Sequence, residues 1–117
     1  MLIGLKYKNK KINLDVEVCK WKFLGLMFSR QKSAKALLFD FKKSMRVSIH
    51  SFFCPEFVAV WLDDENRVVE IKKIKPWKIA IFPKKPFMKL VEIPYNQKYE
   101  KMISKLVLVD DAKSLNR

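Results

Sequence analysis

The chain has 117 residues, with 25 lysine or arginine and 12 aspartate or glutamate side chains, so its formal net charge is +13. This length allows one domain with a thin core, and the 50% of hydrophobic residues excludes a disordered chain. With only 2 glycines and 1 histidine, the sequence excludes a glycine-rich phosphate loop and argues against a cysteine and histidine zinc site. We therefore predict neither a metal nor a cofactor.

The domain is expected to span residues 1–117, with its core over 2–109 and a solvated tail over 110–117. The first residues lack the basic and apolar regions of a signal peptide, and no apolar run reaches membrane-spanning length. Cys19 and Cys54 lie far apart in apolar runs, as is typical of free thiols in a reducing compartment, and a single disulfide between them is the alternative. These features predict a cytoplasmic location and no membrane partner, and they leave the oligomeric state open.

Apolar runs rich in β-branched and aromatic residues and bounded by turn residues predict a series of strands. The predicted strands cover residues 2–7, 12–20, 36–41, 49–54, 57–62, 67–74, 87–93 and 107–109. Helical spacing of apolar residues predicts two short helices, over 21–28 and 95–106, with Asn96 as an N-cap. The fold class is therefore α+β and β-rich: a single compact antiparallel sheet or partly closed barrel with two short helices.

Two polar turns join predicted strands. The turn over residues 8–11 contains Asn9, which tolerates left-handed backbone. The turn over 63–66 carries three acidic residues and Asn66, and it should join the central strand 57–62 to a hairpin partner. Three acids in a row could bind a cation, but Asp and Asn turn chemistry is the simpler explanation.

Seven short segments occur in an order and spacing that resemble a known family. They are residues 25–30, 37–41, 49–53, 61–63, 67–70, 75–77 and 90–94. Together they resemble the family called domain of unknown function 192, across residues 16–109. The resemblance implies a compact β-rich domain with short helices, and it implies no activity. The chain departs from the family pattern at 56–59, where members usually carry a Pro–Ile/Leu–Asp step, and at 104–110, where they carry glycines.

A first candidate site is a pocket around the only histidine. We expect its lining to include His50, Ser51, Phe53, Lys75 and Trp77. A histidine can act as a general base, general acid or ligand near neutral pH, whereas a structural imidazole is the alternative. Because no second histidine or serine–histidine–acid spacing is present, we assign no catalytic residue.

Cys54 could act as a nucleophile activated by the histidine four residues before it. In a straight strand the two would be separated by about 13 Å, so only a bend at Pro55 could bring them together. A buried, unreactive thiol is the alternative.

A second candidate site is a basic surface that would bind an anionic partner, because seven lysines and no carboxylate lie between Glu70 and Glu92. The lysines chosen for it are Lys72, Lys73, Lys78, Lys84, Lys85 and Lys89. The alternative is a solvated face, and Trp77 and Trp21 are expected to form core or cleft walls. If the patch lies elsewhere, the second choice is Lys20, Lys22, Arg30, Lys32 and Lys35.

These observations lead to a non-enzymatic binding or accessory module as the first interpretation of function. Two alternatives stay open: a basic surface that binds nucleic acid or another polyanion, and a small-molecule pocket or weak enzyme centred on His50.

Overall fold

The computed structural model describes residues 1–19, 34–46, 48–51, 54–78 and 80–106. Its strands are β1 (Leu2–Tyr7), β2 (Lys10–Asp15), β3 (Glu17–Val18), β4 (Leu37–Met45), β5 (Phe57–Leu62), β6 (Val68–Ile74) and β7 (Phe87–Pro94). The first two form a separate antiparallel hairpin, and the other five form one sheet in the order β3-β4-β7-β5-β6. The β-rich α+β class is confirmed.

The prediction of a single antiparallel sheet or partly closed barrel was wrong in two respects. First, β3 pairs with β4 in parallel, whereas the other pairs in the large sheet are antiparallel. A parallel pair needs a long connection, which residues 19–36 supply. Second, the described strands form an open sheet with β3 and β6 at its edges, not a closed barrel. The predicted strand over 12–20 is also divided between the two sheets, because buried Val16 interrupts it.

Each face of the large sheet buries its own hydrophobic cluster. On β5, alternate side chains point to opposite faces, as period two requires. Val58, Val60 and Leu62 join the cluster that packs against the β1–β2 hairpin. Trp61 joins the other cluster, under the loops that connect the strands. Both faces are covered, so all of β5 is buried, which confirms the predicted central strand.

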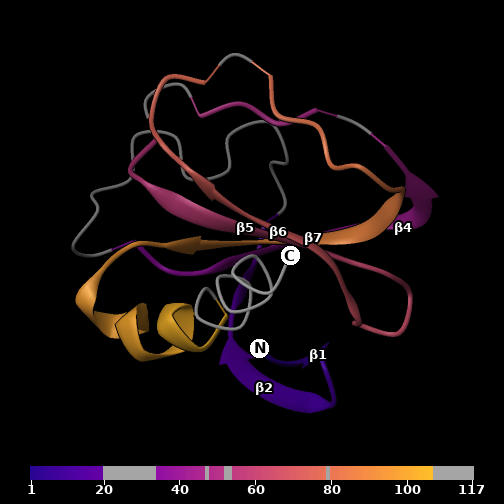
Figure 1. Ribbon diagram of the computed structural model, residues 1–117, viewed down its shortest axis with the longest axis horizontal. Helices are drawn as coiled ribbons and strands as arrows, with labels where there is room; N and C mark the ends of the chain where they lie inside the picture. The colour runs from indigo at the N-terminus through magenta and orange to yellow at the C-terminus, as the bar shows by residue number, and fades with distance from the viewer. Residues whose placement is uncertain (20–33, 47, 52–53, 79, 107–117) are drawn as a thin grey trace, which may run out of the picture.

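Figure 1 shows the β1–β2 hairpin and the C-terminal helix on one side of the large sheet and the connecting loops on the other. A hydrogen bond from the Lys6 backbone N–H to the Asn66 carbonyl oxygen, 2.9 Å long, joins the hairpin to the residue before Arg67. A parallel bridge between Lys6 and Arg67 continues this contact to the start of β6. The hairpin is thus attached to the edge strand, although it forms its own sheet.

The predicted helix over 95–106 begins later than expected. A 3-10 turn, η1 (Gln97–Tyr99), precedes an α-helix over residues 100–106, the last residues described. Asn96 has extended backbone, and its side chain makes no cap hydrogen bond. The side-chain amide donates to the Ala34 carbonyl oxygen, at 3.0 Å. The other predicted helix (21–28), the closing strand (107–109) and the tail (110–117) lie outside the described residues.

Candidate functional site

The structure brings Ser51 against the turn that follows β6. The Ser51 hydroxyl donates to the Lys75 carbonyl oxygen and accepts from the Lys78 backbone N–H, both at 2.7 Å. The hydroxyl therefore bridges the first and last residues of a β-turn, Lys75 and Lys78, whose backbone groups would hydrogen-bond directly to each other in a standard turn. Because this hydroxyl is fully buried and has two strong partners, it fixes the turn and is not available as a nucleophile.

Trp77 lies in this turn with a positive φ of 68°, directly after Pro76. Proline followed by a residue of positive φ is typical of a type II turn, in which glycine normally takes the second of these positions. The Trp77 backbone N–H donates to the Ser51 carbonyl oxygen at 3.0 Å, which helps to hold this unfavourable conformation. Trp77 is 59% exposed, so the expectation that it lies in the core was wrong.

The predicted His50 pocket is assembled only in part. The backbone of the turn containing Lys75 and Trp77 lies against Ser51, as the hydrogen bonds above show. His50 is half-buried and Lys75 is exposed, whereas Phe53 lies outside the described residues. The described part of the chain has concavities of about 360 and 580 Å³. Neither is lined by His50, Ser51, Lys75 or Trp77.

Cys54 is a buried thiol, 7% exposed. Burial, and next the negative charge of Glu92, raise the pKa of Cys54 to about 11, so the thiol stays protonated at neutral pH. Glu92 is itself only 5% exposed, in the middle of β7. Glu92 was not among the predicted site residues, although a carboxylate within the apolar run 90–94 is a signal in the sequence.

The acidic turn after β5 is a structural turn, as predicted. The Asp63 carboxylate accepts from the backbone N–H groups of Glu65 and Arg67, each at 2.9 Å, and from Arg67 Nε at 2.8 Å. Partial burial alone would raise the pKa of Asp63, but these hydrogen bonds outweigh it and lower that pKa below its ordinary value. Among the described residues, no group of three or more His, Cys, Asp or Glu side chains could hold a metal ion.

The lysines predicted to form an anion-binding surface are divided by the sheet. Lys72 and Lys73 are neighbours in β6 and therefore point to opposite faces. Lys72 Nζ donates to the Phe82 carbonyl oxygen at 2.8 Å, whereas Lys73 Nζ lies 3.7 Å from a Glu56 carboxylate oxygen. These two side chains hold parts of the structure together and do not share one surface.

The remaining lysines of that set do not restore a common surface. Lys89 is only partly exposed, and its ammonium donates to the Asn66 side-chain oxygen at 2.8 Å. The backbone N–H of Lys84 donates to a Glu70 carboxylate oxygen at 3.2 Å, which brings a negative charge to the same loop. Lys78 and Lys85 are exposed. In the second set of residues predicted for a basic patch, Lys35 is exposed. The other four, Lys20, Lys22, Arg30 and Lys32, lie outside the described residues.

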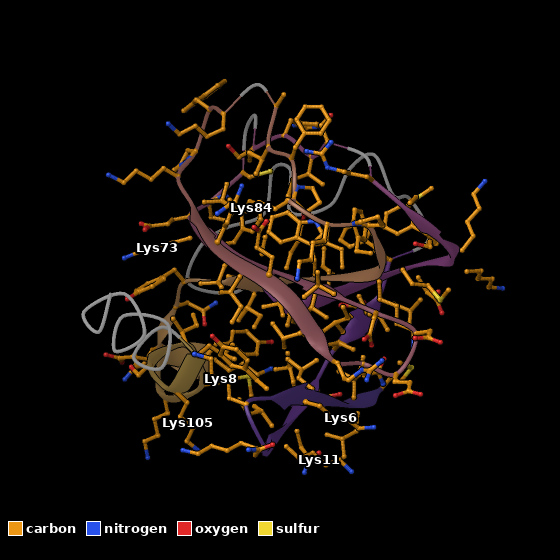
Figure 2. All side chains as sticks on the ribbon, turned by 45° about the vertical axis from the view of Figure 1, so that its right-hand side comes forward. Lys6, Lys8, Lys11, Lys73, Lys84 and Lys105 are labelled. Carbon is orange, nitrogen blue, oxygen red and sulfur yellow. The ribbon has the colours of Figure 1, made fainter. Side chains whose placement is uncertain are left out.

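A denser basic region lies at the β1–β2 turn, where a concavity of about 580 Å³ opens between the hairpin and the start of β6. We call it the hairpin concavity, and its lining residues are Lys6, Tyr7, Lys8, Asn9, Lys10, Lys11, Arg67 and Val68. In Figure 2, Lys6, Lys8 and Lys11 lie in the lower half with the hairpin, away from Lys73 and Lys84 in the upper half.

The tight β1–β2 turn gathers these lysines. Lys8 and Asn9 have positive φ values of 47° and 66°, the geometry of a two-residue hairpin turn. Asn9 thus has the predicted left-handed backbone, but the turn is shorter than the predicted 8–11 because Lys10 already pairs with Tyr7. Lys6 and Lys11 are directly opposed across the two strands.

The charge of the hairpin concavity is only partly offset. Arg67 forms ion pairs with Asp63, at 2.8 Å, and Glu65, at 3.5 Å. The four lysines form no ion pair with any carboxylate of the described residues. This cluster was not predicted, although the sequence contains its signal: four lysines within residues 6–11, with no acid among them.

Comparisons with known proteins connect this chain to the UPF0127 proteins. It is 36% identical over 72 residues to a UPF0127 protein of Pyrococcus horikoshii, a match covering 61% of this chain and 62% of that protein. It is 29% identical over 91 residues to a UPF0127 protein of Pyrococcus furiosus, covering 74% of this chain and 78% of that protein. The chain thus spans less than two thirds of the first relative's length. No family model matches the chain.

Two crystal structures share the fold. One, from Sinorhizobium meliloti, is described as a candidate transcription regulator; its TM-score is 0.65 at 18% identity, covering 80% of this chain and 78% of that one. The other, a protein of unknown function from Novosphingobium aromaticivorans, has a TM-score of 0.66 at 11% identity, covering 86% and 76%. No helix among the described residues is long and apolar enough to cross a membrane. The homologues of this chain are therefore UPF0127 proteins, and its fold is that of the two solved structures.

Proposed function

We propose that this chain is a non-enzymatic binding module for polyanions, with nucleic acid as the expected partner. The hairpin concavity carries this proposal, because four lysines without carboxylate partners line one concave surface. Clustered lysines bind the phosphate backbone by releasing its counterions, without reading its sequence. The formal net charge of +13 adds a long-range attraction for the same ligands.

The local chemistry of the first candidate pocket supports the non-enzymatic part of the proposal. The Ser51 hydroxyl is buried and engaged in two short hydrogen bonds. The raised pKa of Cys54, about 11, keeps its thiol protonated, whereas a nucleophilic cysteine requires the thiolate. Neither side chain is prepared to attack a substrate.

We further propose that the chain belongs to the UPF0127 family. Its matches to UPF0127 proteins of two Pyrococcus species support this assignment. So does the resemblance of its sequence segments to domain of unknown function 192, a family name often linked to UPF0127.

The test is a titration of a labelled oligothymidine with the full chain at two salt concentrations, followed by fluorescence anisotropy. If all four lysines contact phosphates, the slope of log affinity against log salt should be about −3 for a single strand. Affinity should then fall about 50-fold as salt rises fourfold. Absence of binding at the lower salt would contradict the proposal, and so would binding that does not depend on salt.

A further inference from the structure

The lining of the hairpin concavity includes one aromatic residue, Tyr7, which lies between the hydrophobic core and the basic surface. Tyr7 is the last residue of β1 and pairs with Lys10 at the base of the turn. Its ring is partly buried and packs against the hydrophobic cluster beneath the hairpin, and the same residue lines the concavity. The ring is therefore supported by the core and adjoins the basic surface.

The Tyr7 ring already attracts a cation. The Lys8 ammonium lies 5.5 Å from the ring centroid, a distance typical of a cation–π contact. This contact shows that the ammonium can approach the π system. Lys8 is exposed, so its contact with the ring is weak, and a nucleobase that stacks on an aromatic ring is held more strongly. A base can therefore replace the ammonium, which becomes available for the adjoining phosphate.

The opposed pair of lysines gives a second reason to expect an anion here. Lys6 and Lys11 are direct cross-strand neighbours on the hairpin face opposite Tyr7, and like charges in this position destabilise a hairpin. No described carboxylate forms an ion pair with either side chain. A bound phosphate backbone would relieve the repulsion, so ligand binding should also stabilise the hairpin.

We propose that the hairpin concavity binds single-stranded nucleic acid in preference to duplex, with one base stacked on Tyr7 and the flanking phosphates on Lys8 and Lys10, the lysines nearest to that ring. This inference rests on the proposed function and specifies its ligand. An unpaired base can leave its neighbours and expose its face, whereas a base inside a duplex is stacked and paired. Stacking tolerates any base, so the preference should be for strandedness and not for sequence.

The experiment compares three probes of equal length on the wild-type chain: oligothymidine, an abasic strand with the same phosphates, and a duplex. Oligothymidine should bind about tenfold more tightly than the abasic strand, as expected for one stacked base. Equal binding of these two probes would overturn the stacking inference but leave polyanion binding intact. Failure of all three to bind would overturn the proposed function as well.

Two matched substitutions localise the effect to the ring. Tyr7→Phe keeps the aromatic face and should retain the preference for oligothymidine over the abasic strand. Tyr7→Leu keeps an apolar side chain against the core and should abolish that preference while preserving the salt dependence. Thermal unfolding shows whether each variant is folded, and the abasic comparison on the wild type needs no variant. A preference that survives Tyr7→Leu, or is lost equally in Tyr7→Phe, would contradict stacking on this ring.

Discussion

Two lysine-rich segments of this chain look alike in sequence and differ in space. Residues 6–11, at the β1–β2 hairpin, present four lysines to one concavity. Residues 72–89 carry seven lysines spread over a strand, two loops and a second strand. Of these, Lys72, Lys73 and Lys89 contact groups elsewhere in the fold. Only the first segment concentrates its charge.

The difference follows from backbone geometry. Along a strand, successive side chains alternate between the faces, so neighbouring lysines such as Lys72 and Lys73 are separated by the sheet. The same alternation places Lys6 and Lys11 on the hairpin face opposite Tyr7 and Lys10. At a two-residue turn, however, the strand ends and the turn itself lie close enough for all four lysines to line one concavity. Lysine density in the sequence therefore predicts a basic surface well at a turn and poorly along a strand.

The longer segment is organised by hydrogen bonds that fix its loops, and Ser51→Ala should break that organisation. The substitution leaves the Lys75 carbonyl and the Lys78 N–H without the hydroxyl between them. Loss of two buried hydrogen bonds should lower the free energy of unfolding by about 2–4 kcal/mol, measurable by urea denaturation. Binding at the hairpin concavity should be unchanged in the folded variant.

Ser48→Ala is the matched control, because Ser48 is exposed and its removal should change stability by less than about 0.5 kcal/mol. Equal stability of the two variants would mean that the Ser51 hydroxyl does not fix the turn. Loss of ligand binding in folded Ser51→Ala would mean that the two regions are not independent.

Because the pKa of Cys54 is raised, the free energy of unfolding should depend on pH in the alkaline range. The folded thiol has a pKa of about 11, above the unfolded value of about 8.5. The stability that this difference contributes is complete below the unfolded pKa and is lost as pH rises toward the folded one. Between these values, Cys54 should reduce the free energy of unfolding by at most about 1.4 kcal/mol per pH unit.

Urea denaturation of the wild type and Cys54→Ala at several alkaline pH values measures this effect. All other groups are common to the two proteins, so only the difference between their slopes reports on the thiol. Parallel slopes would contradict a buried, protonated Cys54, and so would rapid alkylation of the native thiol at neutral pH.

The smallest expected effect is that of Trp77→Gly. This substitution tests whether the Trp77 side chain is exposed or lies in the core. Glycine removes the strain of a positive φ but adds entropy to the unfolded chain, so the two effects oppose each other. The free energy of unfolding should change by no more than about 1 kcal/mol, in a chemical denaturation experiment. A loss of about 3–5 kcal/mol, typical of a buried tryptophan, would contradict the exposed position.

The sequence was sufficient to predict elements whose patterns are local. Strand β5 is a continuous apolar run, and its hairpin partner follows an Asp and Asn turn, so both could be located. The parallel pairing of β3 depends on contacts with β4 about twenty residues away, which no local pattern encodes. For the same reason, the turn around Trp77 could not be anticipated, because the Ser51 hydroxyl that holds it comes from another segment.

The candidate sites show the same limit. Proximity of Ser51 to Lys75 and Trp77 was expected, but the buried hydroxyl proved to be a structural group. The basic hairpin could have been predicted from residues 6–11. The anion-binding surface was instead predicted in the longer lysine-rich segment, because that segment contains more lysines. Counting charges without their strand or turn context selected the segment that the sheet divides.

The most direct test is a parallel titration of two quadruple variants against oligothymidine. One changes Lys6, Lys8, Lys10 and Lys11 to glutamine, and the other changes Lys72, Lys73, Lys84 and Lys85. Both lose the same charge, so long-range attraction is matched and only the place differs. The hairpin variant should lose most of the salt slope of about −3, and the other should keep most of it. Equal slopes in the two variants, or a larger loss in the second, would contradict the hairpin concavity as the binding site.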